Sequence, residues 1–113
     1  AVVHAGWRGS VKHSQSKVIS MMVGRFGCSP SDILCCLGPS ISLQAFEVGD
    51  EVVESFRLSG FDLEEVSLHN PTSNKYHIDL WKANKFLLLK AGIKEQHISC
   101  SHICTYERYQ EIF

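Results

Sequence analysis

The sequence predicts an α/β fold, a layered α+β sandwich in which a mixed sheet is flanked by helices. Two observations carry this prediction. Short β-branched or continuous apolar runs alternate with longer segments of helical periodicity, and glycine, proline or aspartate stands at most boundaries between them. The chain is also 44% apolar and 20% charged over 113 residues, which is typical of a globular domain. The resulting order is β-α-β-α-β-α-β, and the order of the strands within the sheet stays open.

The first elements are a strand end and a long helix. Ala1–His4 is short, apolar and β-branched and predicts the end of a strand, and a glycine-flanked turn follows over residues 5–9. Ser10 is a suitable N-cap for a helix that runs to about Phe26 and is ended by Gly27. The apolar residues of this helix fall on one face at helical spacing: Val11, Val18, Ile19, Met22 and Phe26.

The middle of the chain predicts a buried strand and a second helix. Ile33–Leu37 is a continuous apolar run, which suits a strand buried on both faces, with Cys35 and Cys36 as core residues. A helix is expected over Asp50–Leu58, with its apolar side chains directed to the core.

The last part of the chain contains one clear helix. Asp79 is expected to be its N-cap rather than a catalytic acid, and Gly92 is expected to end it. The expected elements are, in order, an edge strand near Val66–Leu68, a strand Tyr76–Ile78, this helix over Leu80–Ala91, a strand Ile98–Ile103 and a final helical turn Thr105–Phe113.

Charge and cysteine content narrow the functional classes. Eleven basic and twelve acidic residues give a net charge of −1, which provides no electrostatic case for a nucleic acid or an anionic membrane as partner. No apolar run approaches the roughly 18 residues that a membrane span needs. Five cysteines form an odd set without a signal-peptide pattern, so we expect reduced thiols and a cytoplasmic protein. The apolar ends, Ala1-Val2-Val3 and Ile112-Phe113, lead us to expect a partial domain.

The first candidate site is HAGWRG, residues 4–9. A strand that ends at His4 would present its side chain where α/β sheets place ligand-contacting residues. Two glycines shape the loop, and the free N–H groups of a helix start, together with Arg8, suit a phosphate or a carboxylate. The alternative is a simple glycine turn with a hydrogen-bonded histidine and a surface arginine, since no nucleotide-loop signature is matched.

Two further groups of residues are candidates. Cys100, His102 and Cys104 alternate, and on one face of a strand they would offer a soft metal two thiols and an imidazole, although zinc ligands more often come from turns. Ser40 or Glu47 could contact a ligand in a pocket. The alternative for Glu47 is a helix cap or an ion-pair partner.

Five stretches in a fixed order carry a resemblance to a known family. They are HAGWRG at 4–9, LGPSI at 37–41, FEVGDEV at 46–52, HIDLWKAN at 77–84 and Cys-Thr at 104–105. The chain resembles the YfiH-like family, also called the laccase-domain or polyphenol oxidase family, whose members are regarded as purine nucleoside phosphorylases. The resemblance covers essentially the whole chain, and HAGWRG is its most specific motif.

The resemblance implies a domain arrangement and a metal site. Residues 1–113 would be the C-terminal-middle portion of a single YfiH-like domain with no internal boundary. The family binds zinc, earlier described as copper, through two histidines and one cysteine, and the histidine of HAGWRG corresponds to His4. The other two ligands lie upstream in the family, and none of the five cysteines here matches the ligand cysteine. The family continues into Phe-Phe-Ser-x-Arg-Arg, of which Phe113 would be the first residue.

The activity implied is metal-dependent phosphorolysis of adenosine, inosine, guanosine or methylthioadenosine by inorganic phosphate, with adenosine deaminase activity as a side reaction. His4 is then expected to be the catalytic residue and metal ligand, and Arg8 and Gly9 the substrate-binding residues. The phosphate role of Arg8 follows from its chemistry and is not a family assignment. The alternatives are a copper-dependent polyphenol oxidase (laccase) and a non-catalytic structural or partner-binding domain. Because zinc takes three or four protein ligands, the chain alone is expected to be inactive. Preferred nucleoside, metal in vivo and oligomeric state stay open.

Overall fold

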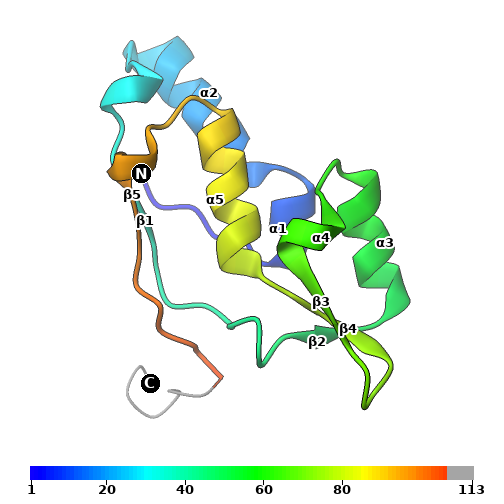
Figure 1. Cartoon of the computed structure of the whole chain (residues 1–113). Coiled ribbons are helices and arrows are strands. Elements are labelled where there is room, and N and C mark those ends of the chain that lie inside the picture. Colours follow the sequence, from blue (N-terminus) through cyan, green and yellow to red (C-terminus); the bar gives the residue numbers. More distant parts are fainter. Residues whose placement is uncertain (107–113) are drawn as a thin grey trace.

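The computed structural model describes residues 1–106 of the chain. Figure 1 shows helix α5 standing between a two-stranded sheet on one side and a three-stranded sheet with short helices on the other. The elements in chain order are α1 (Trp7–Val11), α2 (Ser14–Phe26), a 3₁₀ turn η1 (Pro30–Asp32), β1 (Cys35–Leu37), β2 (Glu47–Val48), α3 (Asp50–Leu58), α4 (Leu63–Val66), β3 (Ser67–Asn70), β4 (Lys75–Ile78), α5 (Leu80–Lys90), η2 (Glu95–His97) and β5 (Ile98–Cys100).

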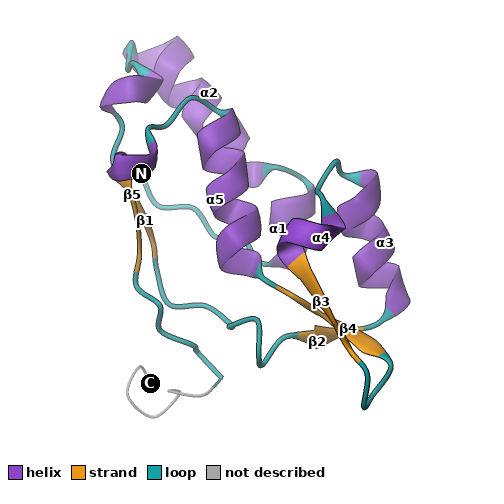
Figure 2. Cartoon of the chain, viewed as in Figure 1, coloured by secondary structure: helices purple, strands orange, loops and turns teal. Residues whose placement is uncertain are grey.

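The strands form two separate sheets, so the predicted mixed α/β character is confirmed with a different arrangement (Figure 2). β1 and β5 pair in parallel, with Cys36 opposite Ser99, and an isolated parallel bridge between Ser40 and Cys104 continues this pairing. β2, β4 and β3 pair antiparallel in that spatial order. Among residues 1–106, β3 pairs only with β4, which confirms the predicted edge strand.

The core is divided into two clusters. The first packs α3, α4 and α5 against the three-stranded sheet, and Phe56 and Ile78 are among its fully buried members. The second joins α2, β1, β5 and the C-terminal half of α5 around Ile19, Ile33, Leu88 and Ile93. The two clusters meet on α5, because Leu87 belongs to the first and its neighbour Leu88 to the second.

Both predicted ends of α5 are confirmed. The Asp79 carboxylate accepts a hydrogen bond from the Lys82 N–H at 3.0 Å, which satisfies one of the free donors in the first turn. Gly92 follows the helix with φ +98°, a conformation that an L side chain rarely adopts. A Cβ at Gly92 would also lie 3.1 Å from the Cβ of Pro30.

The predicted single helix from Ser10 to Phe26 is wrong, because the chain breaks at His13. α1 begins at Trp7, and His13 adopts the left-handed conformation, with φ 58°, between α1 and α2. Tertiary contacts hold this break. The His13 Nε2 lies 3.2 Å from the Ser59 carbonyl oxygen, the Ser59 hydroxyl donates to the Val11 carbonyl, and the imidazole meets the Phe61 ring edge-on.

The predicted strand Ala1–His4 is also wrong: this segment is coil and pairs with no strand among residues 1–106. β-Branched residues favour an extended backbone, but a strand needs a partner, and here Val2 and Val3 are exposed.

The strand predicted over Ile33–Leu37 exists as the shorter β1, and its burial on both faces is wrong. Leu34 and Cys36 are exposed, so Cys36 is not a core residue. Cys35 and Leu37 point to the other face, against the second cluster. Burial there raises the pKa of the Cys35 thiol.

The C-terminal strand is shorter than predicted, because β5 ends at Cys100 and His102 has a positive φ of 54°. β2 and α4 carry no clear sequence signal and were not expected. The predicted turn Thr105–Phe113 lies outside the described residues apart from its first two. Within residues 1–106, no helix has the length and apolar character required to cross a bilayer.

Candidate functional site

The HAGWRG segment places His4 just before α1, with its imidazole exposed. Among the described residues, no side chain or backbone group forms a hydrogen bond or ion pair with this imidazole. Gly6 has φ −67° and ψ −169°, values that any residue can adopt. A Cβ at Gly6 would lie 3.5 Å from His4 Nε2. Gly6 therefore lies beside the imidazole at an ordinary van der Waals distance, and its backbone conformation does not require glycine.

Arg8 lies on α1 with its guanidinium over the ring of Trp7, 4.6 Å from the ring centroid. It is exposed, and no carboxylate within residues 1–106 pairs with it. Stacking on the indole limits the orientations of the guanidinium without occupying its N–H donors. Arg8 is therefore available for an anion, as its chemistry predicts.

Gly9 faces the interior of the turn. A Cβ at this position would lie 3.4 Å from the Ser14 hydroxyl, 3.5 Å from the His4 carbonyl oxygen and 3.6 Å from the Ala5 side chain. These are ordinary van der Waals distances, so Gly9 lies next to the His4 backbone without a steric requirement for glycine.

Sequence reasoning missed a buried polar trio beneath this segment. The Ser10 hydroxyl lies 3.1 Å from Asn84 Oδ1, and Gln15 Nε2 donates to the same oxygen. The Asn84 amide in turn donates to the Leu80 carbonyl at 2.8 Å. The sequence predicts only a capping role for Ser10. The signal that could have pointed to the trio is that Asn84 ends one of the five family-like stretches and Ser10 directly follows another.

A second polar cluster lies on the three-stranded sheet. His77 Nδ1 donates to the Leu43 carbonyl at 2.9 Å, which leaves Nε2 facing Glu47 Oε2 at 3.3 Å and the Asn70 amide at 3.2 Å. The Ser73 hydroxyl also donates to Glu47 Oε2, at 2.9 Å. The hydrogen bond from Ser73, followed by the charges of nearby basic residues, lowers the pKa of Glu47. Glu47 is therefore held by hydrogen bonds from Ser73 and Asn70, with the His77 ring beside its carboxylate.

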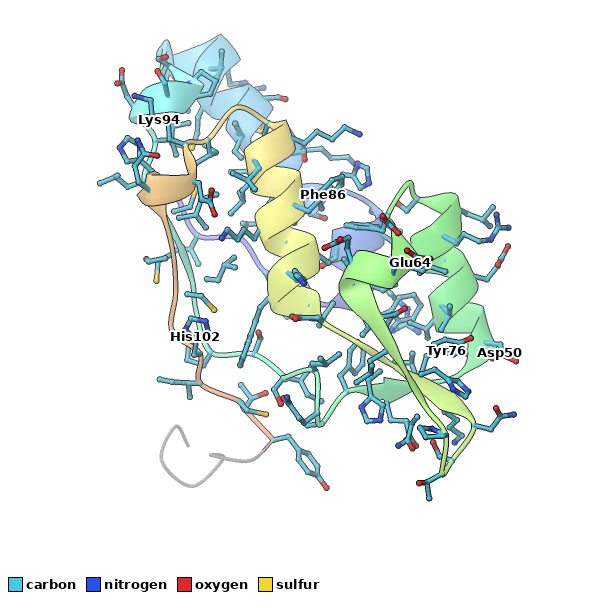
Figure 3. All side chains as sticks on the ribbon, viewed as in Figure 1. Asp50, Glu64, Tyr76, Phe86, Lys94 and His102 are labelled. Carbon is cyan, nitrogen blue, oxygen red and sulfur yellow. The ribbon has the colours of Figure 1, made fainter. Side chains whose placement is uncertain are left out.

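Ser40 and the Cys100–Cys104 segment are held by structural contacts. Ser40 accepts a hydrogen bond from the Trp81 indole N–H, and the Ser42 N–H donates to the buried Cys104 sulfur at 3.3 Å. His102, labelled in Figure 3, lies on the segment after β5. Its ring meets that of Trp81 edge-on, with ring centroids 5.6 Å apart.

Alternate residues share a face only in a continuous strand, and the backbone turn at His102 interrupts the strand here. Cys100, His102 and Cys104 therefore do not converge. In the described part of the chain, no group of three or more His, Cys, Asp or Glu side chains is arranged to hold a metal ion. His4 fits the role of one exposed imidazole ligand, and the remaining ligands of a zinc site would have to come from elsewhere.

Comparison with solved structures defines the class of protein. The fold matches YlmD from Geobacillus stearothermophilus with a TM-score of 0.84 and 31% identity, over 96% of this chain and 40% of that one. It matches YfiH from Bacillus licheniformis with a TM-score of 0.84 and 30% identity, over 94% of this chain and 40% of that one. The chain therefore has the mixed α/β fold of these proteins.

The family is shown by the sequence. The chain belongs to the family described as multi-copper polyphenol oxidoreductase laccase, whose model matches residues 1–113. It is 42% identical to a purine nucleoside phosphorylase of Bacteroides thetaiotaomicron, over 100% of this chain and 42% of that protein. It is 41% identical to adenosine deaminase RL5 of an unknown prokaryotic organism, over 100% of this chain and 43% of that protein. The chain thus spans less than half the length of these curated relatives.

Proposed function

We propose that this chain is part of a longer cytoplasmic enzyme that cleaves purine nucleosides with inorganic phosphate. In that protein, residues 1–113 form the C-terminal-middle portion of one domain. The observation that carries the proposal is the HAGWRG segment, which presents within one short turn an imidazole and a guanidinium that have no hydrogen-bond or ion-pair partner among residues 1–106. Relatives named purine nucleoside phosphorylase at 42% and 32% identity support the reaction class.

The residues of the HAGWRG segment have different roles in metal and phosphate binding, according to their chemistry. His4 supplies one neutral nitrogen ligand to zinc, with copper as the alternative metal, and Gly6 leaves space beside that nitrogen. A bound zinc ion would supply Lewis-acid polarisation of the substrate. Arg8 holds phosphate through paired N–H donors as a phosphate oxygen bonds to the ribose C1′ and the bond from C1′ to the base breaks. Gly9 follows Arg8 in the same turn and contacts the substrate through its backbone.

Two related activities follow the same logic. Adenosine, inosine, guanosine and methylthioadenosine are the proposed substrates, since all four present the same bond from ribose to a purine. The relative named adenosine deaminase supports deamination of adenosine as a side reaction.

The family description favours a copper-dependent polyphenol oxidase as the second candidate. Multi-copper chemistry needs several histidines in close groups, whereas His4 is the single histidine of the HAGWRG turn.

The test uses the full-length protein. With zinc bound, it is expected to release hypoxanthine from inosine only when phosphate is present. His4→Ala is expected to abolish the reaction and to remove the bound zinc. His69→Ala is the matched control, because His69 is also exposed but bonds to Asn74 on the far hairpin. Base release without phosphate, or none at all, would overturn the proposal, and phenol oxidation after copper loading would favour the second candidate.

A further inference from the structure

We propose that the buried trio of Ser10, Gln15 and Asn84 is the device that positions the HAGWRG turn for ligand binding. Ser10 and Asn84 would then be positioning residues that act through the backbone of residues 4–8. The inference rests on the proposed function for the identity of the site, and on the hydrogen bonds and burial of the trio for the mechanism.

The hydrogen bonds form a continuous path from α5 to the turn. The Ser10 backbone N–H donates to the Gly6 carbonyl at 2.9 Å. The Ser10 hydroxyl lies 2.9 Å from the same carbonyl oxygen and 3.1 Å from Asn84 Oδ1, so its single hydrogen is shared between the turn and α5. Asn84 cannot rotate, because its other amide atom donates to Leu80. The first turn of α5 therefore fixes the residue that lies two positions after His4.

The burial of the trio favours orientation over stability as its role. Ser10, Gln15 and Asn84 are 0%, 6% and 9% exposed. Gln15 Oε1 is buried and finds no partner within residues 1–106. A buried acceptor without a partner costs free energy, so apolar side chains of similar size would make a more stable contact. A polar trio instead specifies one geometry, since its hydrogen bonds form only in one arrangement of α1 on α5.

α1 needs such a restraint because it is short. A five-residue helix has little stability of its own, so tertiary contacts determine its orientation. Its C-terminal end is held by the hydrogen bond from the Ser59 hydroxyl to the Val11 carbonyl. Its N-terminal end is held through the Ser10 side chain, whose hydroxyl contacts both Asn84 and the carbonyl oxygen of Gly6, the N-cap residue. Without the second anchor, α1 can pivot about the first, and His4 and Arg8 move with the free end.

The experiment compares Ser10→Ala, Asn84→Ala and the double variant in the full-length protein. Ser67→Ala is the matched control, because it removes an equivalent serine bond, to the Leu63 carbonyl, away from the turn. Three properties are measured. Zinc affinity is obtained by chelator competition, and kcat and KM are determined with inosine. Amide hydrogen exchange is followed on peptides that cover residues 3–11.

Each single variant is expected to lower zinc affinity about tenfold, the range found for groups that orient metal ligands. The double variant is expected to lower it no further, because both changes break one link. Exchange is expected to rise over residues 3–11 in these variants and not in Ser67→Ala.

Three results would overturn the inference: unchanged zinc affinity in Ser10→Ala, additive losses in the double variant, or an equal loss of affinity in Ser67→Ala. If Asn84→Ala does not fold, the zinc affinity of the milder variant Ser10→Ala tests the positioning role. A wild-type protein that binds zinc but releases no base with phosphate contradicts the proposed function alone, and zinc affinity and exchange then still decide the positioning role. A wild-type protein that binds no zinc overturns both.

Discussion

Two substitutions of Asp79, to Ala and to Asn, distinguish a structural role of its carboxylate from a catalytic one. Its carboxylate caps α5, and α5 has no acidic residue in its first turn. Asp79→Ala removes the cap hydrogen bond, at about 1 kcal/mol, and the favourable charge at the helix start, at about 0.5 kcal/mol. The expected loss in the free energy of unfolding is therefore about 1.5 kcal/mol. Asp79→Asn keeps an oxygen acceptor and loses only the charge, so its expected loss is about 0.5 kcal/mol.

The assay pairs urea unfolding of the full-length protein, at an unchanged m-value, with inosine phosphorolysis. Both variants are expected to keep kcat within about twofold of wild type, whereas loss of a general acid typically costs roughly 100-fold or more. An Asn variant that is stable but has lost activity by that factor would refute the structural role. Equal destabilisation by Ala and Asn would refute the capping argument.

Four other substitutions test the core, two glycine positions and the polar cluster. Phe56→Ala is expected to cost about 3–5 kcal/mol in chemical denaturation, because the ring is fully buried; a loss below about 1 kcal/mol would contradict this packing. Gly92→Ala should cost about 1–2 kcal/mol in thermal unfolding, because its φ is +98°, whereas Gly24→Ala, with open space around its Cβ, should be stabilising. The Ser73 hydrogen bond lowers the pKa of Glu47, so the stability it contributes is present above the ordinary glutamate pKa and is lost as the pH falls through the lowered value. Glu47→Gln should therefore lose less stability on acidification than wild type, and parallel pH profiles would exclude the effect.

Elements with strong local signals could be predicted from the sequence. α5 has a capping aspartate, an apolar face and a terminating glycine, and all three act locally. α3 was placed over Asp50–Leu58 with the same bounds as in the structure, because its apolar residues recur at helical spacing next to a glycine.

The features that were missed depend on contacts between distant residues. The break at His13 requires Ser59 and Phe61, which lie more than forty positions away in the chain, and no local breaker marks it. The role of Ser10 depends on Asn84, 74 positions further on. The candidate site shows the same division: the residues of HAGWRG could be named from the motif, but the trio beneath them could be found only in the folded structure.

The meeting of the two core clusters on α5 has a consequence for how the molecule unfolds. Leu87 and Leu88 are adjacent on one helix, so unfolding of α5 would remove contacts from both clusters at once. Within residues 1–106 the two sheets share no strand, and we expect α5 to couple their unfolding. Amides of the β4 strand and of the β1–β5 pair are therefore expected to exchange with the same opening free energy, as members of a single cooperative unit.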